Sequence, residues 1–97
     1  MRMMLKVTMD TLMASEAISE GTLSTVLKTT LDNLKPEAAY FGAENGKRRA
    51  LIFFDLADTS DIPSIAEPLF ETFGAEIEFA PVMNVDDLGR GLAKLKS

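Results

Sequence analysis

The chain contains neither cysteine nor histidine among its 97 residues. Without cysteine it can form no disulfide framework and no thiolate metal site. Without histidine it lacks the usual haem ligand, and its serines lack the commonest base that activates a nucleophile. No calcium-loop spacing is present either. We therefore expect no cofactor and no metal, and no nucleophile motif marks the chain as an enzyme.

Basic residues and long apolar runs are also scarce. Ten Lys and Arg stand against 15 Asp and Glu, a net charge of −5. Nucleic-acid binding depends on contacts between cations and phosphates, and the basic cluster here is limited to Lys47-Arg48-Arg49, so we expect no nucleic-acid partner. No apolar stretch could span a bilayer, and the N-terminus lacks the pattern of a signal peptide. These absences predict a cytoplasmic protein that does not act at a membrane.

The composition is that of one folded domain. Hydrophobic residues make up 46% and charged residues 26% of the chain, and only 4 prolines and 6 glycines are present, which argues against disorder. A chain of this length can enclose a single core but not two. We expect residues 1–97 to form one domain.

The strongest local signal is a β-hairpin in the stretch 38–56. Asn45-Gly46 lies between two apolar, aromatic-rich runs, and this dipeptide is typical of a type I′ turn because both central residues need positive φ. The two-residue turn predicts that Glu44 opposes Lys47, Gly42 opposes Arg49 and Tyr40 opposes Leu51. One face then carries Tyr40, Gly42, Arg49, Leu51, Phe53 and Asp55. The more apolar face, with Ala39, Phe41, Ala43, Arg48, Ala50, Ile52, Phe54 and Leu56, is expected to pack on helices.

The remaining pattern predicts two further strands and three helices. Alternation over 3–10 and over 75–83 indicates strands, the second ending at Pro81 or lying at an edge. An apolar stripe at helical spacing over residues 11 to about 34 predicts one helix, capped by Ser15, in which Gly21 marks close packing or a later start.

A second helix is expected between the entry Asp61-Ile62-Pro63 and the stop at Gly74, with a kink or a break near Ser64 caused by Pro68. A short terminal helix follows a cap formed by residues 84–87, with its leucines on one side.

The order β-α-β-β-α-β-α predicts an α+β protein. We expect a ferredoxin-like β-α-β-β-α-β sandwich with a short C-terminal helix and a four-stranded antiparallel sheet. Both crossover helices should then cover one face and leave the other bare. From the strand parities, the bare face collects Lys6, Thr8, Asp10, Tyr40, Arg49, Leu51, Phe53, Asp55, Glu76 and Glu78. Its mixture of apolar and charged residues suits an interface with polar margins.

Several short segments also carry a resemblance. They are Tyr40-Phe41, Gly46-Lys47-Arg48, Phe53-Phe54-Asp55, Ile62-Pro63, Ala66-Glu67-Pro68-Leu69-Phe70, Ala75-Glu76-Ile77-Glu78 and Pro81-Val82-Met83. This pattern resembles small uncharacterised bacterial proteins whose layout is similar to the dimeric α+β-barrel superfamily, which includes antibiotic-biosynthesis-type monooxygenases and muconolactone-isomerase-like domains. The resemblance implies a homodimer whose sheets pack face to face, with ligands between sheet and helices or in the barrel. The missing histidine removes the haem ligand and the histidine chemistry of several members.

Two groups on the bare face could carry chemistry. Tyr40 and Arg49 could hold a small anion, or form a cross-strand pair at a dimer interface, which we favour. The carboxylates of Asp10, Asp55, Glu76 and Glu78 could serve acid–base work or bind a cation. The alternative, which we favour, is a solvated or salt-bridged margin with Lys6 and Arg49 as partners.

The sequence thus predicts a small homodimeric domain that binds a small ligand or a protein partner through the helix-free sheet face. The ligand or interface candidates are Tyr40, Arg49, Leu51, Phe53, Asp55, Asp10 and Glu78. One alternative is a cofactor-independent monooxygenase or isomerase that uses Tyr40, Arg49 and Asp55 around an aromatic substrate, which rests on fold analogy. Another is a regulatory subunit or sensor whose partner sheet comes from a different protein.

Overall fold

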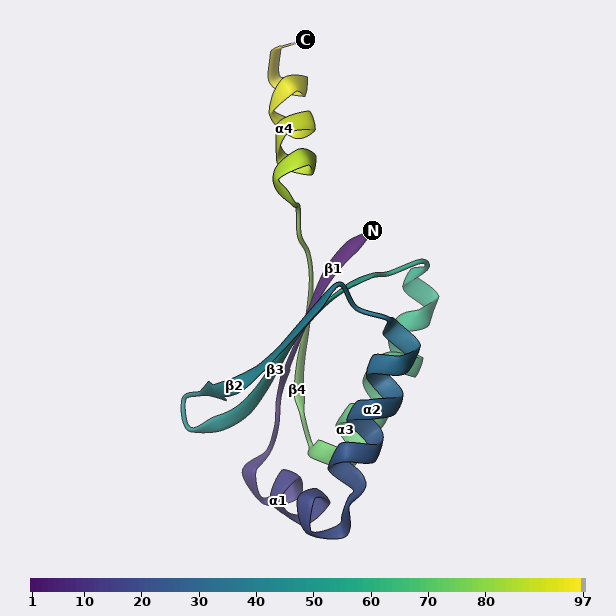
Figure 1. Cartoon of the computed structure of the whole chain (residues 1–97), viewed down its shortest axis with the longest axis vertical. Helices are drawn as coiled ribbons and strands as arrows, with labels where there is room; N and C mark the ends of the chain where they lie inside the picture. The colour runs from purple at the N-terminus through teal and green to yellow at the C-terminus, as the bar shows by residue number, and fades with distance from the viewer. Residues whose placement is uncertain (97) are drawn as a thin grey trace.

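The computed structural model describes residues 1–96, which form an α+β fold with a four-stranded antiparallel sheet in the order β2-β3-β1-β4 (Figure 1). The strands are β1 (Arg2–Thr8), β2 (Ala38–Glu44), β3 (Lys47–Asp55) and β4 (Glu76–Pro81). The helices in this part of the chain are α1 (Thr11–Glu20), α2 (Thr22–Leu34), α3 (Ile62–Phe73) and α4 (Val85–Ala93), with 3₁₀ turns η1 (Thr59–Asp61) and η2 (Lys94–Lys96). The sheet is as predicted, but the element order is not the expected β-α-β-β-α-β, because two helices lie between β1 and β2.

The single helix predicted over residues 11–34 is wrong, and Gly21 is the reason. Gly21 has a φ of +80°, a left-handed conformation that ends α1 and starts α2. The predicted cap is wrong as well: Asp10 caps α1, its carboxylate accepting the N–H of Met13 at 3.0 Å. Ser15 lies inside α1, where its hydroxyl accepts a hydrogen bond from Arg48 at 3.3 Å. The helix starts earlier than the leucine and valine stripe indicated, because small alanines form its buried side.

The hairpin is confirmed in turn and register. Asn45 and Gly46 have φ values of +52° and +78°. The predicted pairs Glu44–Lys47, Gly42–Arg49 and Tyr40–Leu51 are all present in the β2–β3 ladder. Its residues on the helix-covered face supply much of the core, with Ala50, Ile52, Phe54 and Leu56 all buried.

One predicted core residue of the hairpin is wrong. Phe41 is 56% exposed although it lies on the same side of the sheet as Ile52. Figure 1 shows why: the tip of the β2–β3 hairpin extends past the helices and turns away from them, so no helix within residues 1–96 covers this part of β2. Twist of a long two-stranded ribbon produces this divergence.

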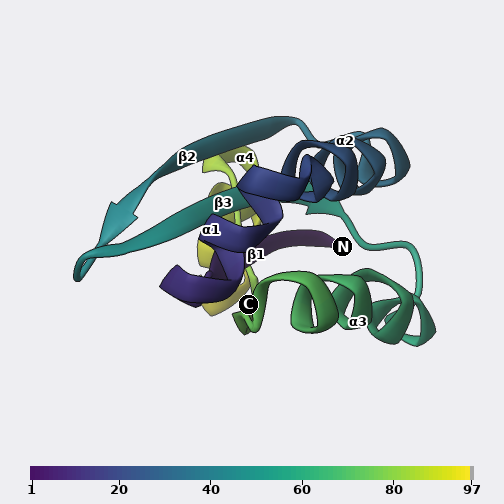
Figure 2. The ribbon, with the colours of Figure 1, turned by 90° about the horizontal axis from the view of Figure 1, so that it is seen from below.

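The helices α2 and α3 lie side by side on one face of the sheet, and α1 closes the lower end of that layer (Figure 2). Beneath them, β1 contributes a fully buried row of alternate residues, with Leu5 and Val7 at 0% exposure. Leu69 and Phe73 of α3 are equally inaccessible. The core therefore lies between this face and the helices, and no helix of the described part of the chain lies above the opposite face.

The limits of α3 are confirmed, but not the predicted break. Pro63 lies in its first turn, and Gly74, with a φ of +54°, ends it. The helix nevertheless continues through Pro68. Ser64 and Pro68 both lie on the exposed side, so the carbonyl that loses its hydrogen bond lies toward solvent rather than in the core.

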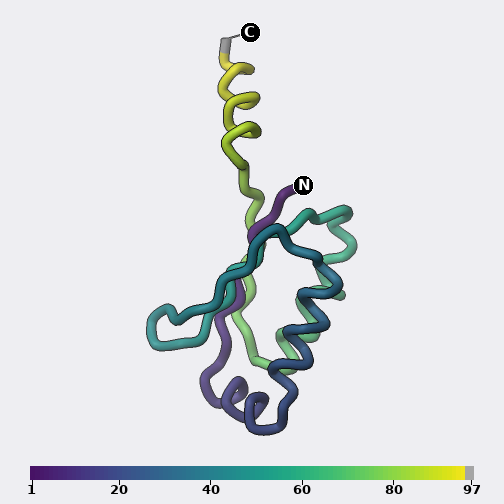
Figure 3. The backbone as a smooth tube through the Cα atoms, in the orientation of Figure 1, coloured from purple at the N-terminus to yellow at the C-terminus, as the bar shows by residue number. Residues whose placement is uncertain are grey.

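The molecule is longer than a compact chain of this size. Its radius of gyration is 15.4 Å and its extents are 56 × 28 × 18 Å, whereas about 13 Å is typical of a 100-residue domain. The tube in Figure 3 shows the reason: after β4 the chain continues in the same direction, and α4 stands apart from every other helix. Within residues 1–96, no helix has the length and apolar character needed to cross a membrane.

Candidate functional site

The helix-free face of the sheet divides into two parts, and the first is apolar. Strand pairing places Phe53 between Ala38 and Met4, and Met4 beside Ala80. In the next row Tyr40 lies opposite Leu51. We call this set the apolar half; its members are Met4, Ala38, Tyr40, Leu51, Phe53 and Ala80. All are half-buried except Tyr40, which is 63% exposed.

The second part is charged and lies toward the hairpin tip. Lys6 is paired with Glu78 on β4, and Thr8 lies between Arg49 and Glu76. The end of the hairpin adds Glu44. We call Lys6, Glu44, Arg49, Glu76 and Glu78 the charged half. It holds two cations against three carboxylates, which disfavours a bound anion.

Glu44 joins this group because the hairpin bends over the sheet. Its carboxylate lies 2.8 Å from the Lys6 Nζ, although β3 separates the two strands, and 3.8 Å from the Arg49 Nη1. The hydrogen bond from Lys6 lowers the pKa of Glu44 below its usual value. The sequence analysis missed Glu44, although strand alternation places it on the same face as Tyr40 and Gly42. Its contact with Lys6, two strands away, could not be predicted from the register, which pairs Glu44 with Lys47.

Arg49 lies over Gly42, as the pairing predicted. A Cβ at Gly42 would be 3.4 Å from the Arg49 Nη2. The Arg49 Nε is buried and has no hydrogen-bond partner in the described part of the chain. A shallow hollow of about 210 Å³ lies nearby, lined by Lys6, Thr8, Glu44, Asn45, Lys47 and Glu76. The charged half is thus slightly concave and open to solvent.

The seven predicted site residues are only partly brought together. Tyr40, Arg49, Leu51, Phe53 and Glu78 share the helix-free face. Asp10 does not: its placement on that face is wrong, because the strand ends at Thr8 and Asp10 turns to cap α1.

Asp55 lies at the far end of the sheet, where it contacts the N-terminal amine of Met1 at 2.7 Å. Asp55 and Arg49 are six positions apart on β3, which corresponds to about 20 Å. One small substrate could not reach both.

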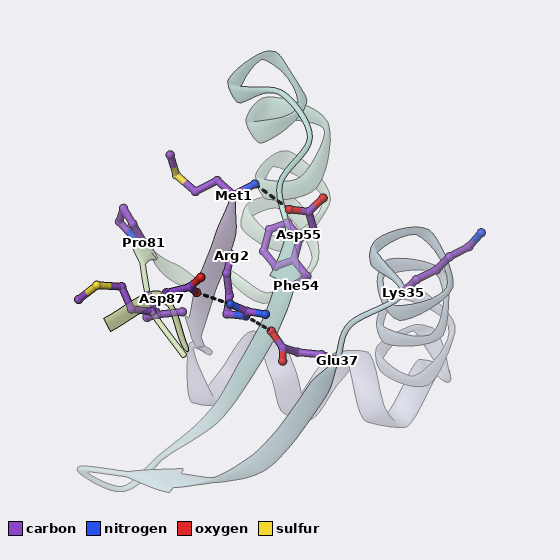
Figure 4. A pocket seen from close by; sticks show the side chains of 10 residues that line it. Met1, Arg2, Lys35, Glu37, Phe54, Asp55, Pro81 and Asp87 are labelled. Atoms are coloured by element: carbon purple, nitrogen blue, oxygen red, sulfur yellow. Dashed lines mark hydrogen bonds and ion pairs between the residues drawn. The ribbon is translucent and has the colours of Figure 1, made fainter. Parts of the chain in front are cut away.

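A larger hollow of about 690 Å³ opens at the Asp55 end of the sheet (Figure 4). Arg2 lies at its centre, with its guanidinium between Glu37, at 2.6 Å, and Asp87 of α4. The hydrogen bond to Glu37 raises the pKa of Arg2. The pKa of Asp87 is lowered by the backbone N–H of Asn84 and by the cations Arg2 and Arg90. Arg2 therefore connects the start of α4 to the sheet, a contact that strand alternation gave no reason to expect.

The helix α4 presents an uncovered apolar side. Val85, Leu88 and Leu92 of α4 and Leu95 of η2 recur at helical spacing and are 85%, 45%, 53% and 80% exposed. The helix begins with the predicted cap, in which Asn84 and Asp87 each accept the other's backbone N–H. In contrast, Gly89 and Gly91 weaken its interior by about 1 kcal/mol each relative to alanine.

Comparison of the chain with models of protein families, with curated proteins and with solved structures found no match. The resemblance to the dimeric α+β-barrel superfamily thus gains no support from a relative, and the site must be interpreted from its own geometry. The arrangement brings together a flat apolar surface, a charged margin and a projecting amphipathic helix. Such features are typical of protein association rather than of chemistry on a small molecule.

Proposed function

We propose that this protein functions as a homodimer, and that the helix-free sheet face is its association surface. The observation that carries the proposal is the apolar half, where Met4, Leu51 and Phe53 lie in adjoining rows with no helix above them. A contiguous apolar patch of this kind usually has a partner. The charged half beside it would form the polar rim found around such interfaces.

The topology supports this proposal. A sheet in the order β2-β3-β1-β4 with its crossover helices on one face is the arrangement that right-handed βαβ connections produce. We infer that the domain is a variant of the ferredoxin-like sandwich, modified by the division of its first helix at Gly21 and by the addition of α4. In such a sandwich the uncovered sheet face is the surface available to a partner.

The enzyme alternative has less support from the geometry. It requires Tyr40, Arg49 and Asp55 around one aromatic substrate, and Arg49 and Asp55 occupy opposite ends of β3. An anion held by Tyr40 and Arg49 would meet the carboxylates of Glu44 and Glu76 close by. The enzyme and the binding of an anion by Tyr40 and Arg49 both stay predictions that rest on the sequence pattern.

The association is tested by sedimentation velocity over nanomolar to micromolar concentrations. We expect a concentration-dependent dimer for the wild-type chain, and a weaker dimer for Phe53→Ser, which removes the largest half-buried side chain of the apolar half. Phe41→Ser is the matched control, because Phe41 lies on the neighbouring strand but on the opposite face. Urea unfolding of both variants verifies that each remains folded.

A strict monomer at all concentrations would refute the proposal. Equal weakening by Phe53→Ser and Phe41→Ser would also contradict it, since the association would then not depend on the helix-free face. Association only with a different protein from the native source, and not with a second copy, would favour the regulatory-subunit alternative.

A further inference from the structure

The apolar half of the sheet and the apolar side of α4 are two uncovered surfaces of one chain. We infer that α4 of each copy packs on the helix-free face of the other copy, in a reciprocal two-fold exchange of helices. This inference rests on the proposed self-association and names the element that mediates it. Each copy would then supply both a surface and the helix that covers the partner's surface.

α4 needs a partner surface to be stable as a helix. A helix of nine residues is marginal in water, and Gly89 and Gly91 lower its propensity further. The capping box of Asn84 and Asp87 nevertheless defines its start, and its apolar residues fall on one side. A helix with a well-formed start, a weak interior and an uncovered apolar side is expected to gain its stability from packing.

The geometry of the link before α4 prevents this helix from covering the sheet of its own chain. The β1–β4 pairing extends to Val82, whose N–H donates to the carbonyl of Arg2 at 3.1 Å. Only two residues then precede α4, and the second, Asn84, is extended with a φ of −85° and a ψ of −178°. The ion pair between Arg2 and Asp87 also holds the first turn of α4 at the end of the sheet. Folding back would break this pair and require a reversal within two residues.

The length of α4 with η2 matches the length of the sheet. The nine residues of α4 and the three of η2 span about 20 Å at the usual rise of helical residues. The seven residues of β1 span about 23 Å. One helix is therefore long enough to run along nearly the whole sheet of a second copy.

The two halves of the helix-free face lie in an order that suits α4 and η2 of a second copy. The apolar half lies nearer the end of the sheet from which α4 leaves, and the charged half lies nearer the hairpin tip. Exchange about an axis near that end would place Leu88 of one copy over the partner's apolar half. The basic residue Lys94 would then approach the partner's Glu76 and Glu78. These two carboxylates form no ion pair within residues 1–96 of their own chain.

Because the chain has no cysteine, engineered cysteines can test the exchange cleanly. Leu92→Cys places a thiol on the apolar side of α4, and Leu51→Cys places one near the middle of the helix-free face. A mass-tagged full chain with the first substitution is mixed with an untagged full chain with the second and treated with a short bismaleimide. We expect a mixed covalent dimer. The matched control replaces Leu51→Cys with Glu67→Cys, an exposed position on α3, and should give at least about tenfold less product.

The alternative arrangements give different products. If α4 pairs with α4, the Leu92→Cys chain alone forms the covalent dimer and the mixed product is absent, which overturns the inference. If α4 folds onto its own sheet, a chain with both cysteines closes within itself at nanomolar concentration, which also overturns it. A mixed product that depends on protein concentration supports the exchange.

Sedimentation distinguishes this inference from the proposed function. A wild-type dimer whose affinity is unchanged in Leu88→Ala and Leu92→Ala would leave the association through the sheet intact and refute the role of α4. A wild-type monomer would refute both. The exchange predicts that each leucine substitution weakens the dimer by at least about tenfold, the loss expected for a leucine that becomes buried on association.

Discussion

α3 and α4 are both amphipathic helices that follow strands of the same sheet, but only α3 covers its apolar side. Leu69 and Phe73 of α3 are fully buried, while Leu88 and Leu92 of α4 are about half exposed. The difference lies in the connections. η1 and the residues before it let the chain turn from β3 back over the sheet, whereas the short extended link after β4 carries α4 beyond it. An apolar stripe predicts that a helix will pack; the connection determines which surface it can reach.

The largest effect on the free energy of unfolding is expected for a substitution on the covered apolar side of α3. Phe73→Ala should lower the free energy of unfolding by about 3–5 kcal/mol, because it leaves a cavity in the core. Phe70→Ala is the matched control on the same helix; Phe70 is 42% exposed, and about 1 kcal/mol or less is expected. Urea denaturation at a fixed protein concentration measures both. Equal losses would show that α3 is not packed as described.

The corresponding substitution in α4 should behave differently. Leu92→Ala is expected to leave the stability of the dilute monomer unchanged and to remove about 1.5–3 kcal/mol of stability at concentrations where the dimer forms. The reason is that, in the proposed exchange of helices, Leu92 contacts a partner only in the dimer. Urea midpoints at nanomolar and at high micromolar protein separate the two cases. A loss that is the same at both concentrations would mean that Leu92 packs within its own chain.

The caps of α1 and α4 should differ in the same way, with smaller effects on stability. Asp10→Ala removes the side chain that caps α1 and should cost about 1 kcal/mol of unfolding free energy at any protein concentration. Asn84→Ala removes half of the α4 capping box. It should fray α4 by a similar free energy but affect global unfolding only when the dimer is present. The NMR shifts of the α4 amides, followed with concentration, detect the fraying.

The change in stability with pH should be smaller than the effects of these substitutions and should be specific to α4. The N–H of Asn84 and the neighbouring cations lower the pKa of Asp87 in the folded state below its usual 3.8. A depressed carboxylate pKa contributes stability that is present above the unfolded pKa and is lost as the pH falls through the folded value. We therefore expect α4 to fray as the pH falls below 3.8, and Asp87→Asn to reduce this dependence. The first turn of α3 has no acidic residue and should show no such change. NMR titration of Asp87 at or above 3.8 would contradict the mechanism.

Much of the fold follows from local sequence rules. Asn45-Gly46 determines the turn and therefore the β2–β3 register, and alternation in β1 identifies its buried residues. Gly74 and the cap at Asn84 fix two helix boundaries. What these rules could not predict is how far each element reaches in space. A period of 3.6 residues does not show that Gly21 would adopt positive φ and divide the first helix.

The site was less predictable because it, too, depends on how far each element reaches in space. Parity correctly placed Tyr40, Leu51 and Phe53 on one face, because strand pairing fixes it. It could not find the contact of Glu44 with Lys6, which depends on the twist of the hairpin. It also placed Asp10 on the sheet, although the strand ends two residues earlier.

Hydrogen exchange of the α3 and α4 backbone amides, measured at low and at high protein concentration, determines whether a second copy covers α4. The reciprocal packing of α4 predicts that protection of its amides rises with concentration as the dimer forms, while the amides of α3, already buried within one chain, change little. If α4 exchanges as an unprotected helix at concentrations where the protein sediments as a dimer, the helix is not covered by the second copy and the account is wrong.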